Sequence, residues 1–392
     1  MATNSFLMAI PQYFGNDASL EAGRMLKEMG CTKVLVLHFK SAGGAGIEVP
    51  IIETIRKEGI EVLTDASVIS DPDSDLVTGI AQKAREEDVN GIVAIGGGSI
   101  LDAGKGVKLL LSNKGDISDY YPLTTPQAGC VPMIAIPTTS GTGSEASKGT
   151  VITDSKTGIK KVIIGPGTTP DAALIDPKLT LGVPPKVTAA CAFDALSHAI
   201  DAILSTMTNR IVQGIAYEGI RLMKNSYKRA VEYGDDLEAR SDMHLAANYG
   251  GIVLANAKCN MCHAFAHALG ALYHVPHGTC CAIFTPACLE FLAEERPEEI
   301  REIARLLDVP FEDGESAFVI ARRTGEEIHR MYRSVGLEDI TAFVPSAEEA
   351  IERIIPVAEK DIMARFSPRK LDQAGAEEIV RRTFELAEGG VN

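Results

Sequence analysis

Residues 91–105 read G-I-V-A-I-G-G-G-S-I-L-D-A-G-K, and this stretch decides the fold of the first half of the chain. The apolar run 91–95 has the length and composition of a buried parallel strand. Three glycines follow, and Ser99 is a favourable N-cap for a helix that carries Asp102 and Lys105. The exposed N–H groups and the dipole at such a helix start suit a pyrophosphate, although a Gly-rich turn of this kind also serves purely structural roles. The stretch matches neither the G-x-G-x-x-G fingerprint nor a Walker loop.

The alternation of strand and helix continues on both sides of this stretch. Short apolar runs predict strands, and segments with helical spacing lie between them. Such an alternation is typical of a doubly wound parallel sheet. We therefore predict an α/β dinucleotide-binding domain over residues 1–182. The predicted parallel strands are 5–15, 33–37, 60–63, 91–95, 133–136 and 173–176, and an antiparallel pair is expected at 151–154 and 160–164. Helices are predicted at 18–29 and 76–87, and a further one ends at about residue 57.

A second polar loop follows the strand predicted at 133–136. Residues 137–145 read P-T-T-S-G-T-G-S-E, so hydroxyl groups and glycines are dense in it. Ligands of open α/β sheets bind at the carboxyl ends of the strands. Two Gly-rich loops at such ends are what a dinucleotide needs, one near the pyrophosphate and one near the nicotinamide. A flexible surface loop is the alternative interpretation.

The second half of the chain has a different period. From Val187 onward, apolar residues recur with the 3.6-residue period of helices, and little strand signal remains. We predict an all-α metal-binding domain over residues 183–392, with helices at 187–205, 209–232, 236–257, 259–272, 278–293, 298–307, 314–335, 346–359 and 374–388.

Histidines gather in this second half. Residues 262–277 read C-H-A-F-A-H-A-L-G-A-L-Y-H-V-P-H and hold four of the eight histidines. His263 and His267 are four residues apart, which places them on one helix face, and we expect Gly270 to loosen or end that helix before His277. Upstream, Asp194 and His198 show the same spacing in the apolar stretch F-D-A-L-S-H-A-I-D. A carboxylate and imidazoles predict a divalent metal site, and hydrogen-bonded core histidines are the alternative.

Composition limits the class of protein. The chain has 392 residues, 45% hydrophobic and 23% charged, as in globular proteins. The net charge of −15 argues against nucleic-acid partners and against anionic membranes. The sequence contains no uninterrupted apolar run of about 18 residues, so we expect no membrane span. The N-terminus lacks the pattern of a secretory signal. The eight cysteines form no paired framework, so we expect reduced thiols in a cytoplasmic protein.

Four motifs taken together resemble the iron-containing, or group III, alcohol dehydrogenase family, which has a dehydroquinate-synthase-like fold. They are G-G-G-S-I-L-D-A-G-K, P-T-T-S-G-T-G-S-E, D-A-L-S-H-A-I-D and C-H-A-F-A-H-A-L-G with V-P-H-G, in this order along nearly the whole chain. The resemblance implies an oxidoreductase that uses NAD or NADP together with Fe²⁺ or Zn²⁺, and that forms a homodimer or a larger homo-oligomer.

The same resemblance implies roles for individual residues. The metal ligands would be Asp194, His198, His263 and His277, and His267 would lie beside the nicotinamide and take part in proton transfer. The cofactor would be bound by Phe39, Gly96, Gly97, Gly98, Ser99, Asp102, Thr138, Thr139, Thr142 and Ser144.

Two departures from the family pattern bear on specificity. Phe39 stands where many NAD-preferring relatives have Asp, and Lys40 follows it, which makes NADP use feasible. Lys148 and Lys258 stand at positions that are usually uncharged or small, and by resemblance they lie near the substrate. The hypothesis is that they bind an anionic tail. Solvated or ion-paired lysines are the alternative. The predicted substrate contacts are Lys148, Gly149, Val151, Lys258 and Cys259.

The predicted function is hydride transfer between nicotinamide and a short primary alcohol or aldehyde, with the metal as Lewis acid. The substrate hypothesis adds a carboxylate, sulfonate or phosphonate tail. Two alternatives stay open from the sequence: a non-redox metal lyase of dehydroquinate-synthase type, and an ordinary short-chain alcohol dehydrogenase with a neutral substrate.

Overall fold

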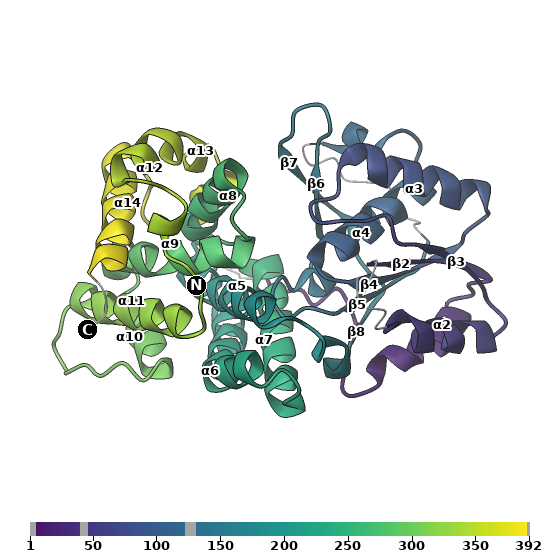
Figure 1. The fold of residues 1–392 in the computed structure, drawn as a ribbon, viewed down its shortest axis with the longest axis horizontal. Helices are drawn as coiled ribbons and strands as arrows, with labels where there is room; N and C mark the ends of the chain where they lie inside the picture. Colours follow the sequence, from purple (N-terminus) through teal and green to yellow (C-terminus); the bar gives the residue numbers. More distant parts are fainter. Residues whose placement is uncertain (1–4, 40–45, 122–130, 390–392) are drawn as a thin grey trace. The chain divides into compact units, whose positions relative to one another are not determined.

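Six parallel strands form the central sheet of the first half of the chain (Figure 1). The computed structural model describes residues 5–39, 46–121 and 131–389. Neighbouring strands follow the order β1-β8-β5-β4-β2-β3, and each neighbouring pair is parallel. The predicted doubly wound parallel sheet is therefore confirmed. Its strands are β1 (Gln12–Phe14), β2 (Lys33–His38), β3 (Glu61–Asp65), β4 (Gly91–Gly96), β5 (Met133–Pro137) and β8 (Ala172–Ile175).

Helices cover both faces of this sheet because its strands are apolar on both sides. Leu35 and Leu37 of β2 share one core with α3 (Ser74–Glu86) and α4 (Gly98–Ser112). The alternate residues of the same strand share the opposite core with α1 (Ala22–Glu28) and α2 (Glu48–Lys57).

The first strand and first helix are shorter than predicted. The strand expected at 5–15 is formed only at β1, and the helix expected at 18–29 begins as a 3₁₀ turn, Ala18–Glu21, before α1. Asp17 takes a left-handed conformation at the start of that turn. The predicted antiparallel pair is confirmed as β6 (Gly149–Thr153) and β7 (Lys160–Ile164).

The strand order places a switch point between β2 and β4. From β2 the chain continues outward to β3, whereas from β4 it continues in the other direction to β5. His38 pairs with Ile95, so Phe39 and Gly96 lie side by side at the carboxyl ends of the two strands. Crevices at such points are where open α/β sheets bind nucleotides.

The second half of the described chain is helical, as predicted. The chain forms two compact units, Met8–Val183 and Pro184–Asn392, and the second also includes the N-terminal stretch that ends at Leu7. Its helices are α5 (Pro185–Leu204), α6 (Arg210–Glu232), α7 (Leu237–Ala257), α8 (Met261–Tyr273), α9 (His277–Phe291), α10 (Pro297–Leu306), α11 (Ala317–Ser334), α12 (Ala347–Arg353), α13 (Ile355–Ala358) and α14 (Gln373–Glu388).

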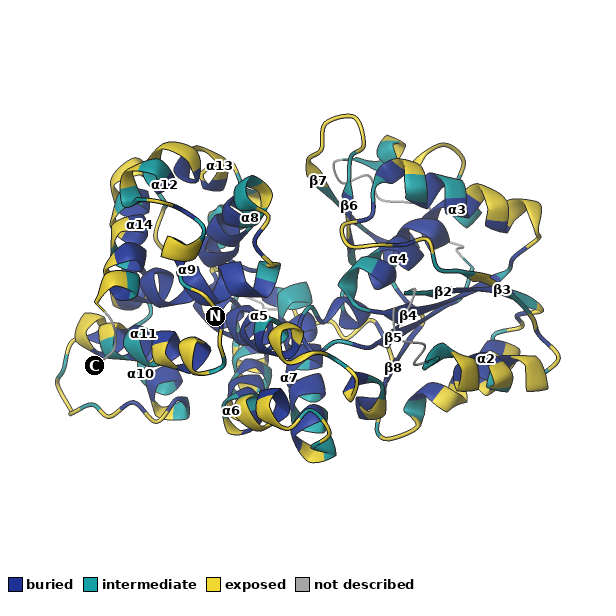
Figure 2. Ribbon diagram, in the orientation of Figure 1, coloured by how far each residue is buried: buried dark blue, intermediate teal, exposed yellow. Residues whose placement is uncertain are grey.

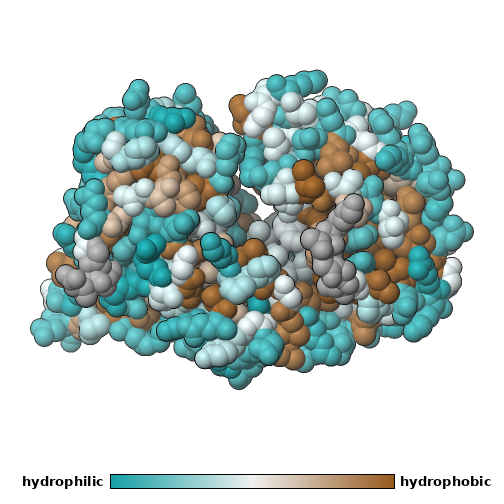
Figure 3. Space-filling view, in the orientation of Figure 1, coloured by the Kyte–Doolittle hydropathy of each residue, from teal (hydrophilic) through white to brown (hydrophobic). Residues whose placement is uncertain are grey.

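Helix α5 is the centre of this helical unit. Among the described residues it is the one helix that is long and apolar enough to cross a membrane. However, 83% of its most apolar stretch of 18 residues is buried inside the protein. In Figure 2, α5 has the colour of buried residues along most of its length, apart from its exposed first turn at residues 185–187. This burial is the property of a core helix. On the face seen in Figure 3, hydrophilic side chains cover most of each unit, with apolar patches between them.

A buried lysine fastens the polar loop of the α/β unit to α4. Lys105 is fully buried, and its Nζ donates hydrogen bonds to Ser144 Oγ at 2.7 Å, to Ser147 Oγ at 3.2 Å and to the carbonyl oxygen of Gly149 at 2.7 Å. Burial lowers the pKa of this lysine, and the nearby Asp102 opposes that change. Segment 144–149 is therefore held by one ammonium group.

Replacing this lysine tests how firmly the loop is held. Lys105→Met removes the three hydrogen bonds that the buried ammonium group donates, so we expect a loss of about 1–3 kcal/mol in the free energy of unfolding. We also expect weaker NADH binding, measured by nucleotide fluorescence. The exposed Lys114, just beyond α4, gives the matched control Lys114→Met. Equal urea midpoints for the two variants would contradict the role of Lys105.

Candidate active site

Three helices of the helical unit carry the predicted metal ligands. Asp194 and His198 lie on α5, His263 lies on α8, and His277 is the first residue of α9. Of the two effects expected of Gly270, loosening or ending the first His-bearing helix, the second does not occur. Helix α8 continues to Tyr273, because the carbonyl of Gly270 still accepts the N–H of residue 274 at 3.0 Å.

A close helix contact brings α9 against α5. A Cβ atom on Gly278 would lie 2.0 Å from the carbonyl oxygen of Ala190 and 3.2 Å from Cβ of Asp194. Only glycine leaves room for this approach. As a result, His277 Nε2 lies 3.5 Å from Asp194 Oδ1.

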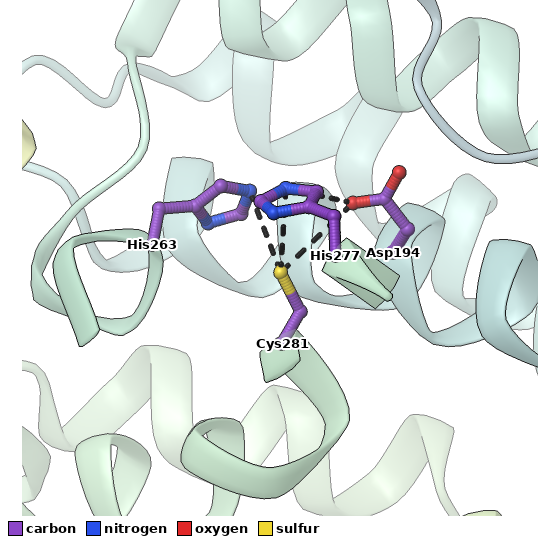
Figure 4. A group of neighbouring side chains, drawn as sticks. All are labelled: Asp194, His263, His277 and Cys281. Carbon is purple, nitrogen blue, oxygen red and sulfur yellow. Dashed lines mark hydrogen bonds and ion pairs between the residues drawn. The ribbon is translucent and has the colours of Figure 1, made fainter. Parts of the chain in front are cut away.

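The predicted ligands converge. The donor atoms of Asp194, His263, His277 and a fourth residue, Cys281, all lie within 4.8 Å of one another (Figure 4). His198 completes the predicted set: its Nε2 lies 3.7 Å from Asp194 Oδ1, and its ring stacks on that of His263 with centroids 4.9 Å apart. Cys281 is not among the predicted ligands, although its i, i+4 spacing from His277 is the same signal that pointed to the other pairs.

The residues present fit a divalent metal ion. Asp194 and His263 are buried, and a buried carboxylate surrounded by imidazoles needs a cation or a proton to balance it. His198 Nδ1 is buried without a hydrogen-bond partner among the described residues. An oxygen and several neutral imidazole nitrogens form a donor set suited to iron or zinc.

Burial keeps the imidazoles of His263 and His277 neutral. It lowers the pKa of His263 well below its ordinary value and that of His277 to about 3. The side chain of His277 is still 38% exposed, so it lies on the open side of the cluster. Neutral rings offer their lone pairs to a metal at physiological pH.

Asp201 orients His263 from behind. Its Oδ2 lies 2.8 Å from His263 Nδ1 and accepts the backbone N–H of Asn260 at 3.0 Å. Complete burial raises the pKa of Asp201 to about 7. A carboxylate on the far nitrogen of a metal-ligating histidine fixes the ring and its tautomer. Asp201 stands outside the predicted set, because contacts between distant residues leave no periodic signal.

His267 has a different environment. Its side chain is 40% exposed, its Nδ1 lies 2.8 Å from Asp361 Oδ2, and its ring stacks on His277 with centroids 5.4 Å apart. Burial opposes ionisation of Asp361, but the hydrogen bond and charge of His267, together with the backbone N–H of Met363, outweigh it and lower the pKa of that carboxyl. An ionised carboxylate behind a partly exposed imidazole suits proton exchange with water.

In the α/β unit, the two predicted cofactor loops pack directly against each other. Thr138 N–H donates to the carbonyl oxygen of Gly96 at 3.0 Å. A Cβ atom on Gly97 would lie 3.3 Å from Thr139 Oγ1, and one on Gly98 would lie 2.8 Å from Thr142 Cγ2. The glycines therefore serve the contact between the loops.

Ser99 is not the N-cap of α4, contrary to prediction. The N-cap is Gly97, and Ser99 lies in the first turn, where its Oγ accepts the N–H of Asp71 at 3.3 Å. Asp102 accepts from Ser144 Oγ at 2.6 Å and from the N–H of Val151 at 2.9 Å, so both carboxylate oxygens hold the domain together. Cofactor contacts of Ser99, Asp102 and Ser144 stay predictions.

The remaining predicted residues lie in both units. Phe39 packs partly buried against the core shared by α3 and α4, while Lys40 lies outside the described residues. Lys148, Gly149 and Val151 lie at or just before β6, and Val151 is exposed. Lys258 ends α7, and the buried Cys259 beside it lies within reach of His198 and His263.

Comparison with known proteins decides the family. Residues 11–177 match iron-containing alcohol dehydrogenase, and residues 188–384 match the C-terminal part of the same family. The chain belongs to the iron-containing alcohol dehydrogenase family. The predicted iron-dependent, nicotinamide-linked alcohol dehydrogenase is thereby confirmed, and the match favours it over the non-redox lyase.

Relatives match over nearly the whole chain. It is 31% identical to the 1,3-propanediol dehydrogenase of Citrobacter freundii, over 97% of this chain and 98% of the relative. It is 29% identical to the NAD-dependent methanol dehydrogenase of Bacillus methanolicus, over 97% of this chain and all of the relative. A solved 1,3-propanediol oxidoreductase superposes with a TM-score of 0.92 at 30% identity, covering 98% of this chain and 100% of that one.

The raised pKa of Asp201 predicts how pH affects metal binding. Below pH 7, a proton must leave Asp201 when a cation binds beside His263, so affinity should fall about tenfold per pH unit. Asp201→Asn carries no such proton and should flatten this slope, measured by competition with a chelating dye.

A second carboxylate supplies the control. Asp361 has a lowered pKa and stays ionised over the same range, so Asp361→Asn should keep the slope of the unmodified chain. An undiminished slope in Asp201→Asn would contradict the assignment.

Proposed function

We propose that this chain catalyses reversible hydride transfer between a nicotinamide nucleotide and a short primary alcohol or aldehyde at the buried Asp–His cluster. The observation that carries the proposal is the convergence of Asp194, His263 and His277 from three helices, with His198 stacked against them. When bound there, iron supplies Lewis-acid polarisation of the substrate oxygen.

The residues around the cluster have distinct roles in this proposal. Asp194, His198, His263 and His277 hold the cation, and Asp201 fixes the ring of His263. His267, held by Asp361 and open to solvent, gives a proton to the oxygen in aldehyde reduction and takes it back in alcohol oxidation.

The loops of the α/β unit suit the nucleotide. The N–H groups of Gly98 and Ser99 begin α4 and have no partner within the helix, so they and the helix dipole favour a pyrophosphate. Thr138, Thr139 and Thr142 line the adjoining loop. The cofactor itself carries the hydride, while these groups set its position.

Nicotinamide absorbance tests the activity. Anaerobically purified, Fe²⁺-loaded protein should oxidise NADH steadily with butyraldehyde or succinic semialdehyde, and NADPH run in parallel measures the cofactor preference. His267→Ala should lower kcat about 10²- to 10⁴-fold, the usual contribution of a general acid–base group. The exposed His274, seven residues on, is the matched control as His274→Asn. A stoichiometric burst without turnover would contradict dehydrogenase activity.

An anionic substrate tail is the finer part of the proposal, and Lys258 supports it. Lys258 has φ 66° and ψ 162°, a region that residues other than glycine rarely occupy. Its Nζ donates to the carbonyl of Ala255 at 3.2 Å, so the ammonium lies over the end of α7, beside the turn that carries Cys259. Strain of this kind at a position next to a site is typical of a functional residue.

Lys148 belongs to the other unit and supports the tail less directly. Its carbonyl oxygen accepts from Thr168 Oγ1 at 2.6 Å, which fixes its backbone just before β6. The carbonyl of Gly149 and the N–H of Val151 are used inside the domain, so the side chains of Lys148 and Val151 are the groups of this segment left for a substrate contact.

Activity on a charged and on a neutral aldehyde distinguishes an enzyme for anionic substrates from one for neutral substrates. Lys258→Met should lower kcat/KM for succinic semialdehyde about 10- to 100-fold, the value of one charge-assisted hydrogen bond, and leave butyraldehyde unchanged. Lys228, exposed on α6, gives the control Lys228→Met with the same change of net charge. A preference for butyraldehyde in the unmodified enzyme would instead make it a neutral-substrate alcohol dehydrogenase.

A homo-oligomer and a cytoplasmic location complete the proposal. The first follows from the family resemblance. The second is supported by seven described cysteines, all of them free thiols.

A further inference from the structure

Cys281 points into the cluster of metal-binding side chains. It lies on α9 one turn after His277 and is fully buried. Its Sγ lies 3.6 Å from His277 Nε2, 3.9 Å from His263 Nε2 and 3.9 Å from Asp194 Oδ1. Figure 4 shows the sulfur facing both rings and the carboxylate.

We propose that Cys281 is a further metal ligand of this centre, and that its sulfur joins the one oxygen and three nitrogens of Asp194, His198, His263 and His277. When the sulfur–metal bond forms, the thiol proton leaves to water. The inference rests on the proposed metal centre, but it requires neither the substrate nor the hydride transfer proposed above.

Neighbouring cysteines show what a structural thiol looks like in this unit. Cys280 Sγ donates to the carbonyl of Val275 at 3.5 Å. Cys262 Sγ contacts the carbonyl of Cys281 at 3.8 Å and the hydroxyl of Thr285 at 3.3 Å. Those contacts are with carbonyl and hydroxyl groups, although the sulfur of Cys262 also lies within 4.8 Å of donor atoms of Asp201 and His263. The sulfur of Cys281 instead faces three side chains of the proposed ligand set.

A sulfur donor changes which cation the centre prefers. Thiolate ligands favour zinc and other softer cations, whereas carboxylates and imidazoles also serve Fe²⁺. His198 lies in a neighbouring group with Cys259 and His263, so the centre holds more donors than one four-coordinate ion needs. The Cys281 thiol therefore raises affinity for zinc and cobalt relative to iron.

Cobalt reports sulfur ligation directly. The full chain, stripped of metal and kept reduced under nitrogen, is titrated with Co²⁺. We expect one Co²⁺ per chain, with visible ligand-field bands and a near-ultraviolet sulfur-to-cobalt charge-transfer band. Cys281→Ala should lose the charge-transfer band and keep the ligand-field bands, because Asp194 and the imidazoles remain. Cys280→Ala is the matched control and should keep both.

Each other result overturns the assignment in a recognisable way. Cobalt bound with no charge-transfer band in the unmodified chain, or a band that survives Cys281→Ala and disappears in Cys259→Ala, rejects Cys281 as the ligand and leaves the metal centre intact. No bound cobalt at all rejects the centre itself.

A second variant and a second readout keep the test decisive. Cys281→Ser preserves the size of the side chain, and its circular dichroism and melting temperature show whether the unit folds. In competition experiments read by elemental analysis, the ratio of zinc to iron affinity should fall about 10- to 100-fold in Cys281→Ala and Cys281→Ser. Losses of metal affinity of this size are found even when only a residue that contacts a metal ligand is replaced. An unchanged ratio in a folded variant would refute the inference.

Discussion

The contact between the start of α9 and α5 is the constraint on which the candidate site depends. Gly278 lets the two helix backbones approach so closely that a Cβ atom at this position would clash with the carbonyl oxygen of Ala190. That approach alone brings His277 to Asp194, since the two residues are 83 positions apart in the sequence and on different helices. Helix α8 then places His263 next to Asp194 and His277. The apolar residues of α8 fix its position, because they belong to the close-packed core of the unit.

Burial then sets the chemistry of the cluster. The same packing that excludes water lowers the pKa of His263 and His277 and raises that of Asp201. Neutral imidazoles and a carboxylate in such surroundings are poorly balanced without a cation, so metal binding and the stability of the cluster are coupled. His267 has different surroundings, because its side chain is partly exposed and Asp361 lies behind it. Two histidines one helical turn apart thus acquire different chemistry from their different exposure.

Periodicity explains what the sequence could predict and what it could not. The 3.6-residue and strand patterns predicted the parallel sheet and the helices of the second half, and i, i+4 spacing grouped Asp194 with His198 and His263 with His267. Partners from distant segments have no such signature: Asp201 and Asp361 became visible only in three dimensions. Ser99 failed as an N-cap because α4 starts earlier, at Gly98, where Thr142 packs against the bare glycine. Local preference gave way there to a contact between two loops.

The exposure of individual residues indicates how the cluster is approached. His267 and His277 keep 40% and 38% of their side-chain surface exposed, whereas Asp194, His198, His263 and Cys281 are buried. The two stacked imidazoles therefore form the open side, and the thiol lies on the closed side. Among these residues, His267 and His277 are therefore the ones that a molecule from solvent meets first. This difference in exposure agrees with the two roles proposed above, in which the buried Cys281 contacts the metal and the partly exposed His267 exchanges a proton with the substrate.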